Sequence, residues 1–269
     1  MRRGESLKER MAANGYVLNG YCSMPSPFAA EIYSMQGWDA VTIDMEHGSI
    51  GFDGAVAILQ AITASGVVPL VRIPKVDPAI IGMLLDAGAL GITCAMINTA
   101  TEARELVRAC KYPPRGIRSL SRTTRAALVY GSDYNARANE STNVFAMIET
   151  AEGMANLDEI TAVDGIDGIY VGSVDLAMSV LGRFPPATGS DPEIDALVED
   201  STRRVVARCK SRGIIAGINA PTVDAAARMI ASGFSFITLS SDVRAMVLQT
   251  KAWIDGVRRL AEGAKRSAA

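Results

Sequence analysis

Residues 40–73 read AVTIDMEHGSIGFDGAVAILQAITASGVVPLVRI, and they contain one complete structural repeat. The two ends, Ala40–Asp44 and Val67–Ile73, are short apolar runs typical of buried strands. Asp53–Ala64 lies between them and has the apolar spacing of an amphipathic helix. Ser65-Gly66 follows this helix, and glycine supplies the left-handed conformation that ends a helix. The stretch therefore predicts two parallel strands joined by a helix.

The same alternation runs along the whole chain. Further strands are expected at Tyr16–Cys22, Gly91–Met96, Val144–Glu149, Gly168–Val171, Ile214–Ile218 and Phe236–Leu239. Further helices are expected at Pro78–Ala87, Thr101–Ala109, Ala155–Thr161, Pro192–Ser211 and Val223–Ala231. Eight strands with intervening helices predict an α/β protein with one (β/α)8 barrel domain over residues 1–269. The first strand is not followed by Gly-x-Gly-x-x-Gly, which disfavours an open nucleotide-binding sheet.

Three segments depart from the repeat. Leu7–Ala13 predicts a short helix that closes the bottom of the barrel. Lys111–Ser141 is a long, arginine-rich, loop-like insertion before the fifth strand, and long loops in compact domains are often functional. Val243–Ala261 predicts an amphipathic helix that packs on its own barrel or on a neighbouring subunit. Its apolar residues are Met246, Leu248, Trp253, Ile254 and Val257.

Composition excludes several classes of protein. The chain is 49% apolar and 21% charged with a net charge of −2, which gives no basic surface for nucleic acid or an anionic membrane. We expect no membrane span, and the Met1–Glu5 segment is not followed by the apolar run of a signal peptide. The four cysteines are widely spaced, which predicts free or buried thiols in a reducing cytoplasm.

Polar residues gather where the predicted strands end. Asp44, Glu46 and the single histidine, His47, follow the second strand, and Arg72 lies at the end of the third. The C-terminal strand ends of a barrel converge on one mouth, where barrel enzymes place their chemistry. Histidine suits proton transfer because its ordinary pKa lies near physiological pH. The alternative is a histidine that only hydrogen-bonds a loop.

Two more carboxylates, Glu149 and Asp175, follow the fifth and sixth strands. Together they predict a hard oxygen site for Mg²⁺ or Mn²⁺, with water or substrate in the remaining positions. The alternative is that each carboxylate caps the helix after its strand. Arg72 stabilises an enolate oxygen beside such a metal, or else forms a structural salt bridge. Gly172 allows backbone N–H groups to approach an anion.

With these residues identified, the chain resembles the HpcH/HpaI family of metal-dependent (class II) pyruvate aldolases from about Leu7 to Leu248. The segments that carry the resemblance are Asp44-Met45-Glu46-His47-Gly48, Val71-Arg72-Ile73-Pro74, Tyr112-Pro113-Pro114-Arg115-Gly116-Ile117-Arg118, Ile148-Glu149-Thr150 and Gly172-Ser173-Val174-Asp175-Leu176. The resemblance implies a metal-binding barrel, usually a hexamer built from dimers that exchange their last helix. The divalent metal would be Mg²⁺, Mn²⁺ or Co²⁺.

The resemblance also assigns roles to particular residues. It makes Glu149 and Asp175 the metal ligands and places Arg72 on the keto or enolate oxygen of pyruvate. His47, oriented by Asp44, handles the proton. The backbone amides near Gly172, Ser173, Val174 and Asp175 hold the substrate carboxylate.

The chain departs from the family pattern at three places. Met147 replaces a glutamine two residues before the metal glutamate, and Ser173 replaces a common proline. The fourth strand, Ile92–Met96, lacks the usual proline. Loss of the polar glutamine leaves the orientation of the substrate, and therefore its identity, open.

The resemblance predicts cleavage of 4-hydroxy-2-oxo acids between C3 and C4. No lysine lies at a strand end for a Schiff base, since Lys75 follows Pro74 in a loop. One alternative is a decarboxylase or acyl-CoA lyase-like enzyme, with the Arg115–Arg125 segment facing the nucleotide. For those arginines we favour loop or subunit-interface salt bridges. Another alternative is a paralogue that binds a keto acid without turning it over.

Overall fold

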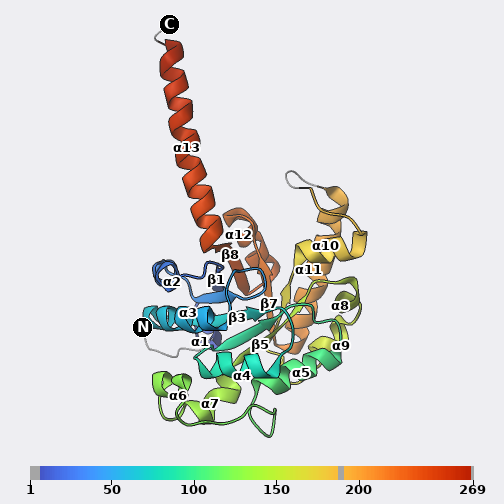
Figure 1. Ribbon diagram of the computed structural model, residues 1–269. Helices are drawn as coiled ribbons and strands as arrows, with labels where there is room; N and C mark the ends of the chain where they lie inside the picture. The colour runs from blue at the N-terminus through green and yellow to red at the C-terminus, as the bar shows by residue number, and fades with distance from the viewer. Residues whose placement is uncertain (1–6, 187–190, 268–269) are drawn as a thin grey trace.

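The computed structural model describes residues 7–186 and 191–267, so the Met1–Glu5 segment lies outside the described residues. Within these ranges, parallel strands close into a barrel in the order β1 to β8, and helices surround it (Figure 1). The (β/α)8 prediction is therefore confirmed. The strands are β1 (Val17–Cys22), β2 (Ala40–Asp44), β3 (Val68–Ile73), β4 (Gly91–Cys94), β5 (Asn143–Ile148), β6 (Gly168–Val171), β7 (Ile215–Asn219) and β8 (Phe236–Ser241).

The helices follow the expected repeat with additions. Those before β5 are α1 (Leu7–Asn14), α2 (Pro27–Ser34), α3 (Phe52–Ser65), α4 (Pro78–Asp86), α5 (Ala100–Cys110), α6 (Arg125–Tyr130) and α7 (Tyr134–Ser141). Those after β5 are α8 (Ala151–Ala155), α9 (Leu157–Thr161), α10 (Ser173–Leu181), α11 (Pro192–Arg212), α12 (Val223–Ser232) and α13 (Asp242–Ser267). Gly66 has a φ of 81°, which is the left-handed end predicted for α3.

Three expectations about helices need correction. The helix predicted at Ala155–Thr161 is two short helices, α8 and α9, which meet at Asn156. The insertion at Lys111–Ser141 is not all loop, because it contains α6 and α7. The sequence analysis did not include α2, which begins with Ser26 as its N-cap and Pro27 in its first turn.

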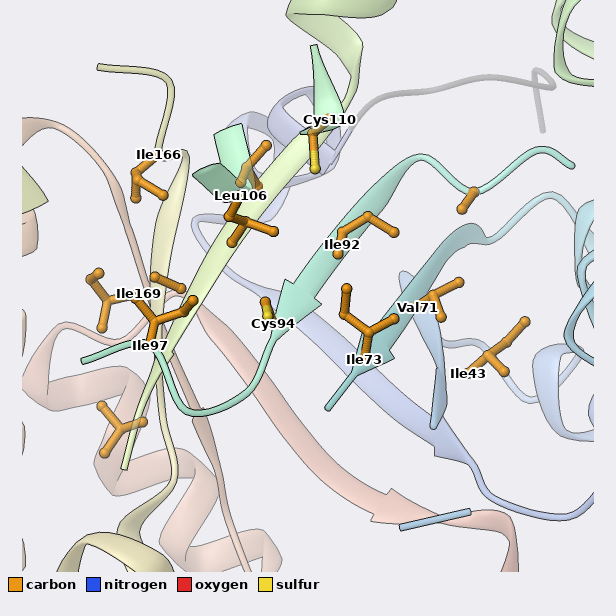
Figure 2. Close-up of a cluster of buried hydrophobic side chains, with 14 of the residues drawn as sticks. Ile43, Val71, Ile73, Ile92, Cys94, Ile97, Leu106, Cys110, Ile166 and Ile169 are labelled. Carbon is orange, nitrogen blue, oxygen red and sulfur yellow. The ribbon is translucent and has the colours of Figure 1, made fainter. Parts of the chain in front are cut away.

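Alternation along each strand separates two cores. Outward residues such as Ile43, Val71 and Ile92 belong to the cluster packed beneath the helices, and Leu106 of α5 is part of the same cluster (Figure 2). Inward residues of the same strands fill the barrel, and they include Ala40, Val68, Leu70, Phe145, Met147, Tyr170 and Phe236. Leu7 of α1 is fully buried in this second cluster, which confirms that α1 closes the end of the barrel where the strands begin.

The same alternation positions polar side chains at the mouth of the barrel. Above Val68 and Leu70, the next inward position of β3 is Arg72, and its register partner on β2 is Asp44. A buried polar layer lies one step deeper, where Asn19 donates to Thr238 Oγ1 and accepts from Thr42 Oγ1, both at 2.9 Å. The interior therefore changes from apolar to ionised toward the C-terminal strand ends.

The last helix leaves the barrel. α13 extends away from the rest of the molecule, with the C-terminus at its far end (Figure 1). The apolar side chains of Met246, Leu248, Trp253, Ile254 and Val257 are exposed to solvent. In this chain α13 therefore does not bury its apolar face on its own barrel. Among the described helices, none is both long enough and apolar enough to cross a membrane.

The four cysteines are Cys22, Cys94, Cys110 and Cys209, and each is a buried free thiol. Burial raises the pKa of all four thiols, so the neutral form dominates. The prediction of free, buried thiols is confirmed.

Candidate active site

A cavity of about 290 Å³ opens at the C-terminal ends of the strands. It brings together most of the residues singled out in the sequence. The predicted residues that line it are Asp44, His47, Arg72, Gly172, Ser173, Val174 and Asp175. Glu149 is not part of the lining, but its side chain contacts the Gly172 backbone from behind. Among the described residues that line the cavity, none is a lysine, as expected from the sequence.

Asp44 and Arg72 form a two-pronged ion pair across β2 and β3. Arg72 Nε donates to Asp44 Oδ1 at 3.0 Å, and Arg72 Nη2 donates to Asp44 Oδ2 at 2.8 Å. Burial by itself raises the pKa of Asp44, but the Arg72 guanidinium outweighs it and holds that pKa below its ordinary value. Tyr21 adds a cation–π contact, with its ring centroid 4.6 Å from Arg72 Cζ. The guanidinium is therefore fixed in position and remains charged.

The partner of Asp44 differs from the prediction. The sequence analysis had Asp44 orient His47, whereas the carboxylate is bound to Arg72 and to two backbone amides. Asp44 Oδ1 accepts the N–H groups of Glu46 (3.2 Å) and His47 (3.1 Å). Asp44 thus holds the backbone of the His47 loop while its side-chain partner is arginine.

Glu46 is a site residue to which the sequence analysis gave no role. Its Oε2 lies 3.2 Å from Arg72 Nη1 and 3.8 Å from His47 Nε2. Burial raises the pKa of Glu46, and the Arg72 charge opposes that rise. The His47 side chain is 66% exposed and lies at the rim of the cavity. An imidazole in this position is accessible to a substrate hydroxyl.

Glu149 is buried, with only 3% of its surface exposed. The Met96 backbone N–H donates to Glu149 Oε1 at 2.8 Å, and Met96 adopts a φ of 56°, which is rare for a residue other than glycine. Burial, together with the negative charges of Glu46 and Asp175, raises the pKa of Glu149 to about 7. This carboxylate therefore lies in a site that favours an added positive charge.

The other oxygen of Glu149 lies against Gly172. A Cβ at position 172 would lie 2.5 Å from Glu149 Oε2, so only glycine allows this carboxylate position. Asp175 is in the first turn of α10 and is exposed. Thr150 caps α8 and α10 has no side-chain cap, so the alternative in which Glu149 and Asp175 act as helix caps is wrong.

These carboxylates fit a hard divalent cation. Oxygen is the ligand atom that Mg²⁺ and Mn²⁺ prefer, and a cation would relieve the negative charge that raises the pKa of Glu149. Over the described part of the chain, no group of three His, Cys, Asp or Glu side chains is arranged to hold a metal. Glu149 and Asp175 would therefore need water or substrate to complete the coordination sphere.

Another part of the cavity lining was not anticipated. It is formed by Asn219 at the end of β7, by Ser240 and Ser241 at the end of β8, and by Arg244 in the first turn of α13. Asn219 continues the inward alternation of β7, so strand parity alone could have identified it. The register of β8 on β1 shifts after Thr238, so strand parity does not identify Ser240 or Ser241. Arg244 carried no such signal, because its position depends on where α13 begins.

The arginines of the insertion lie elsewhere. Arg115 forms ion pairs with Glu140 and Asp164, and Arg118 pairs with Asp86 at 2.6 Å. Arg125 donates to the Ala87 carbonyl oxygen at 2.6 Å. None of these three is among the described residues that line the cavity. The preferred interpretation of Arg115 and Arg118 as salt-bridging loop residues is confirmed, and the acyl-CoA alternative loses its cationic surface.

Comparisons with known proteins identify a family and several relatives of this chain. The model of the HpcH/HpaI aldolase/citrate lyase family matches residues 21–248. The hydroxypyruvate/pyruvate aldolase of Rhizorhabdus wittichii is 39% identical over 90% of this chain and 94% of that protein. The 2-dehydro-3,6-dideoxy-6-sulfogluconate aldolase of Pseudomonas putida is 35% identical over 82% of this chain and 85% of that protein.

A solved structure is similar over almost the whole fold. It is an HpcH/HpaI aldolase/citrate lyase family protein from Burkholderia cenocepacia, with a TM-score of 0.84 and 30% sequence identity. The match covers 94% of this chain and 100% of that one.

Proposed function

The chain belongs to the HpcH/HpaI aldolase/citrate lyase family, and from that premise we propose that it is a class II pyruvate aldolase. It is a carbon–carbon lyase. The proposed reaction cleaves a 4-hydroxy-2-oxo acid to pyruvate and an aldehyde, and the reverse reaction is aldol addition. One observation carries the proposal, namely that Asp44, His47, Arg72 and the Gly172–Asp175 turn share a single cavity.

We propose Glu149 and Asp175 as the ligands of Mg²⁺, Mn²⁺ or Co²⁺. The Met96 N–H donates to Glu149 Oε1, and Oε2 lies close to Gly172, which lines the cavity. When bound, a divalent cation would supply Lewis acidity to the keto and carboxylate oxygens of the substrate. Oxygen ligands discriminate weakly among these three ions, so the choice depends on their availability.

The side chains of the cavity account for the remaining chemistry. His47 takes the proton of the C4 hydroxyl as the C3–C4 bond breaks, and C4 becomes the aldehyde carbon. The bonding electrons form the C2–C3 double bond of the enolate, whose oxygen faces the fixed charge of Arg72. Backbone N–H groups in the first turn of α10, at Ser173 to Asp175, hold the substrate carboxylate. A proton added at C3 then gives pyruvate.

The proposed function is tested by measuring pyruvate release from a panel of 4-hydroxy-2-oxo acids, with Mn²⁺ and with EDTA. Release that requires the metal supports the class II assignment. Release that is unaffected by EDTA contradicts it. Absence of release from every panel member, with keto-acid binding retained, favours the non-catalytic alternative.

The role of His47 has its own test. His47→Ala is expected to lower kcat by about 10² to 10⁴, the usual contribution of a general acid–base group. Ser49→Ala in the same exposed loop is the matched control and keeps its rate. A loss below about threefold in His47→Ala would show that another group transfers the proton.

We also propose that the enzyme is a cytoplasmic homo-oligomer of single-domain chains, either a hexamer or a trimer of dimers. The exposed apolar side chains of α13 support association, because a helix of this composition is stable when another surface covers it. No nucleic-acid or membrane partner is proposed.

A further inference from the structure

We propose that Tyr21 is a positioning residue for the reaction, because the face of its ring holds the Arg72 guanidinium at the tilt that turns its remaining N–H groups toward the enolate oxygen. This inference rests on the proposed function, in which Arg72 stabilises the enolate. Tyr21 lies near the end of β1, and it lines the cavity together with Arg72. Its effect is exerted through the arginine and not on the reacting atoms.

The carboxylates around Arg72 fix only one edge of its guanidinium. Asp44 accepts from Nε and Nη2, and such a two-pronged pair resists rotation within the guanidinium plane. The group can still tilt about that edge, which redirects the N–H groups that Asp44 does not use. Glu46 Oε2 lies 3.2 Å from Nη1, but within the described residues it has no hydrogen-bond partner, so it attracts the charge without setting its direction. A contact on the face of the guanidinium is needed to set the tilt.

Tyr21 supplies that contact. Arg72 Cζ lies over the Tyr21 ring, 4.6 Å from the ring centroid. A cation is attracted to the electron-rich face of an aromatic ring, and the attraction is stronger where water is excluded. Only 9% of the Arg72 side chain is exposed, so the contact is made largely out of solvent. With one edge on Asp44 and one face on the ring, the guanidinium is restrained both within its plane and out of it.

The ring of Tyr21 is itself held by the packed interior of the barrel. Tyr21 and Tyr170 meet edge to face, with ring centroids 6.5 Å apart and ring planes at 70°. Tyr170 meets Phe236 in the same way at 6.2 Å and 72°, and Phe236 packs on Phe145 at 5.1 Å. Aromatic pairs prefer such defined arrangements, so these four side chains form a column of rings that ends at Arg72. A ring that is fixed from below keeps the guanidinium preorganised.

The direction of the Arg72 N–H groups matters more in the transition state than in the ground state. Negative charge grows on the keto oxygen as the enolate forms, so donors aimed at that oxygen stabilise the transition state more than bound pyruvate. A guanidinium that tilts still attracts the pyruvate anion, because it keeps its charge. Loss of the Tyr21 contact is therefore expected to lower kcat and to leave the KM for pyruvate nearly unchanged. A residue that only shaped the cavity would change KM instead.

The test follows exchange of the pyruvate methyl protons with deuterated water, measured by mass spectrometry with the Mn²⁺-loaded enzyme and no aldehyde. This exchange reports enolate formation alone. Tyr21→Phe keeps the ring and removes the hydroxyl, so it is expected to keep the wild-type kcat of exchange. Tyr21→Leu removes the ring face and is expected to lower that kcat about tenfold, the range of a desolvated cation–π contact. Equal kcat values in the two variants would overturn the proposal, whether both match the wild-type enzyme or both fall below it.

A graded series weakens the attraction with little change in the shape of the side chain, and it keeps the proposal testable if Tyr21→Leu does not fold. Fluorine atoms on a phenylalanine at position 21 withdraw electron density from the ring face, so the attraction for a cation falls with each fluorine. We expect kcat to fall stepwise as one, two and three fluorines are introduced. The same residues at position 145 are the matched control, because Phe145 packs on Phe236 in the same column, and they should leave kcat unchanged. A kcat that does not respond to fluorination at position 21 would contradict the proposal.

The wild-type enzyme separates failure of this inference from failure of the proposed function. Absence of exchange in the wild-type enzyme would contradict the aldolase assignment itself, and with it the role of Tyr21. Exchange that is equally fast in the wild-type enzyme and in Tyr21→Leu would leave that assignment intact and overturn the positioning role. A raised KM with an unchanged kcat in Tyr21→Leu would show that Tyr21 only shapes the cavity, which would also overturn it.

Discussion

The pairing of Asp44 with Arg72 shows how single residues build the candidate site. Each was recognisable in the sequence as an ionised residue at the end of an apolar strand. Their pairing could not be recognised in the sequence, because it depends on the register of the two strands. That register places residue 44 of β2 directly beside residue 72 of β3. The bidentate contact then makes Arg72 the best-oriented group in the cavity and assigns Asp44 to arginine rather than to the imidazole.

Removing Asp44 leaves a buried arginine without its principal counter-charge. Asp44→Ala is expected to lower the free energy of unfolding by about 3–5 kcal/mol, measured by urea denaturation. Asp133→Ala is the matched control, because it breaks the exposed Asp133–Arg137 pair and should leave stability unchanged. Equal effects of the two substitutions would contradict the buried-pair argument.

The sign of the pH dependence follows from the lowered pKa of Asp44. The Asp44–Arg72 pair stabilises the folded protein fully at a pH above the pKa of Asp44 in the unfolded chain, which is about 4. This stabilisation is lost as the pH falls through the lower pKa of Asp44 in the folded protein. The stability difference between the wild-type enzyme and Asp44→Ala should therefore be constant at neutral pH and shrink in strong acid.

The raised pKa of Glu149 predicts pH-dependent metal affinity. With a pKa of about 7 in the metal-free protein, protons compete with the cation below neutral pH. The Kd for Mn²⁺, measured by isothermal titration calorimetry, should rise about tenfold for each pH unit below 7. Above pH 7 the Kd should be constant. Glu149→Gln should bind more weakly and lose this slope. The exposed Glu152→Gln is the control and should keep both affinity and slope.

At the scale of elements, the junction of β6 and α10 places the proposed anion-binding turn beside Glu149, the proposed metal ligand. Gly172 has a φ of −89°, so its backbone conformation does not require glycine. The requirement is space, because Glu149 and Met147 both lie within 3 Å of the position a Cβ would take. Glycine is therefore needed at position 172 to make room for side chains at the end of the neighbouring strand, β5.

Gly172→Ala should displace the Glu149 carboxylate. We expect a 10- to 100-fold weaker Mn²⁺ affinity, the usual effect of disturbing the surroundings of a ligand. Gly82→Ala, in the interior of α4, meets nothing within 4 Å and should leave metal affinity unchanged. Wild-type affinity in Gly172→Ala would show that the carboxylate adapts or that Glu149 does not bind metal.

The strands were predictable to within about two residues, since buried parallel strands are continuous apolar runs that end at polar residues. Helices were predictable where glycine ends them, as at Gly66 and Gly213. Short helices were not, and α6 and α7 have too few turns for an apolar period to show. α2 has the capping serine and first-turn proline of a helix start, and that signal was available in the sequence.

At the scale of the whole molecule, α13 is a helix whose apolar side chains are not buried by the rest of its own chain. Because its apolar side chains face solvent in the isolated chain, we expect the protein to elute above its 28.4 kDa chain mass in size-exclusion chromatography with light scattering. Trp253→Asp and Val257→Asp should shift it toward the monomer. Lys251→Asp on the same helix is the control for added charge and should not. A monomeric wild-type protein would contradict the proposed oligomer.

The packed interior of the barrel has a kinetic consequence. Phe145 and Phe236, with ring centroids 5.1 Å apart, close the interior below the cavity, so one opening serves entry and exit. The buried Arg72 and the exposed His47 both line that opening. In the proposed reaction the aldehyde forms beside the exposed His47, so we expect it to depart before the pyruvate held at the buried Arg72. In steady-state inhibition experiments, pyruvate would compete with the intact acid for free enzyme, whereas the aldehyde would give a mixed pattern.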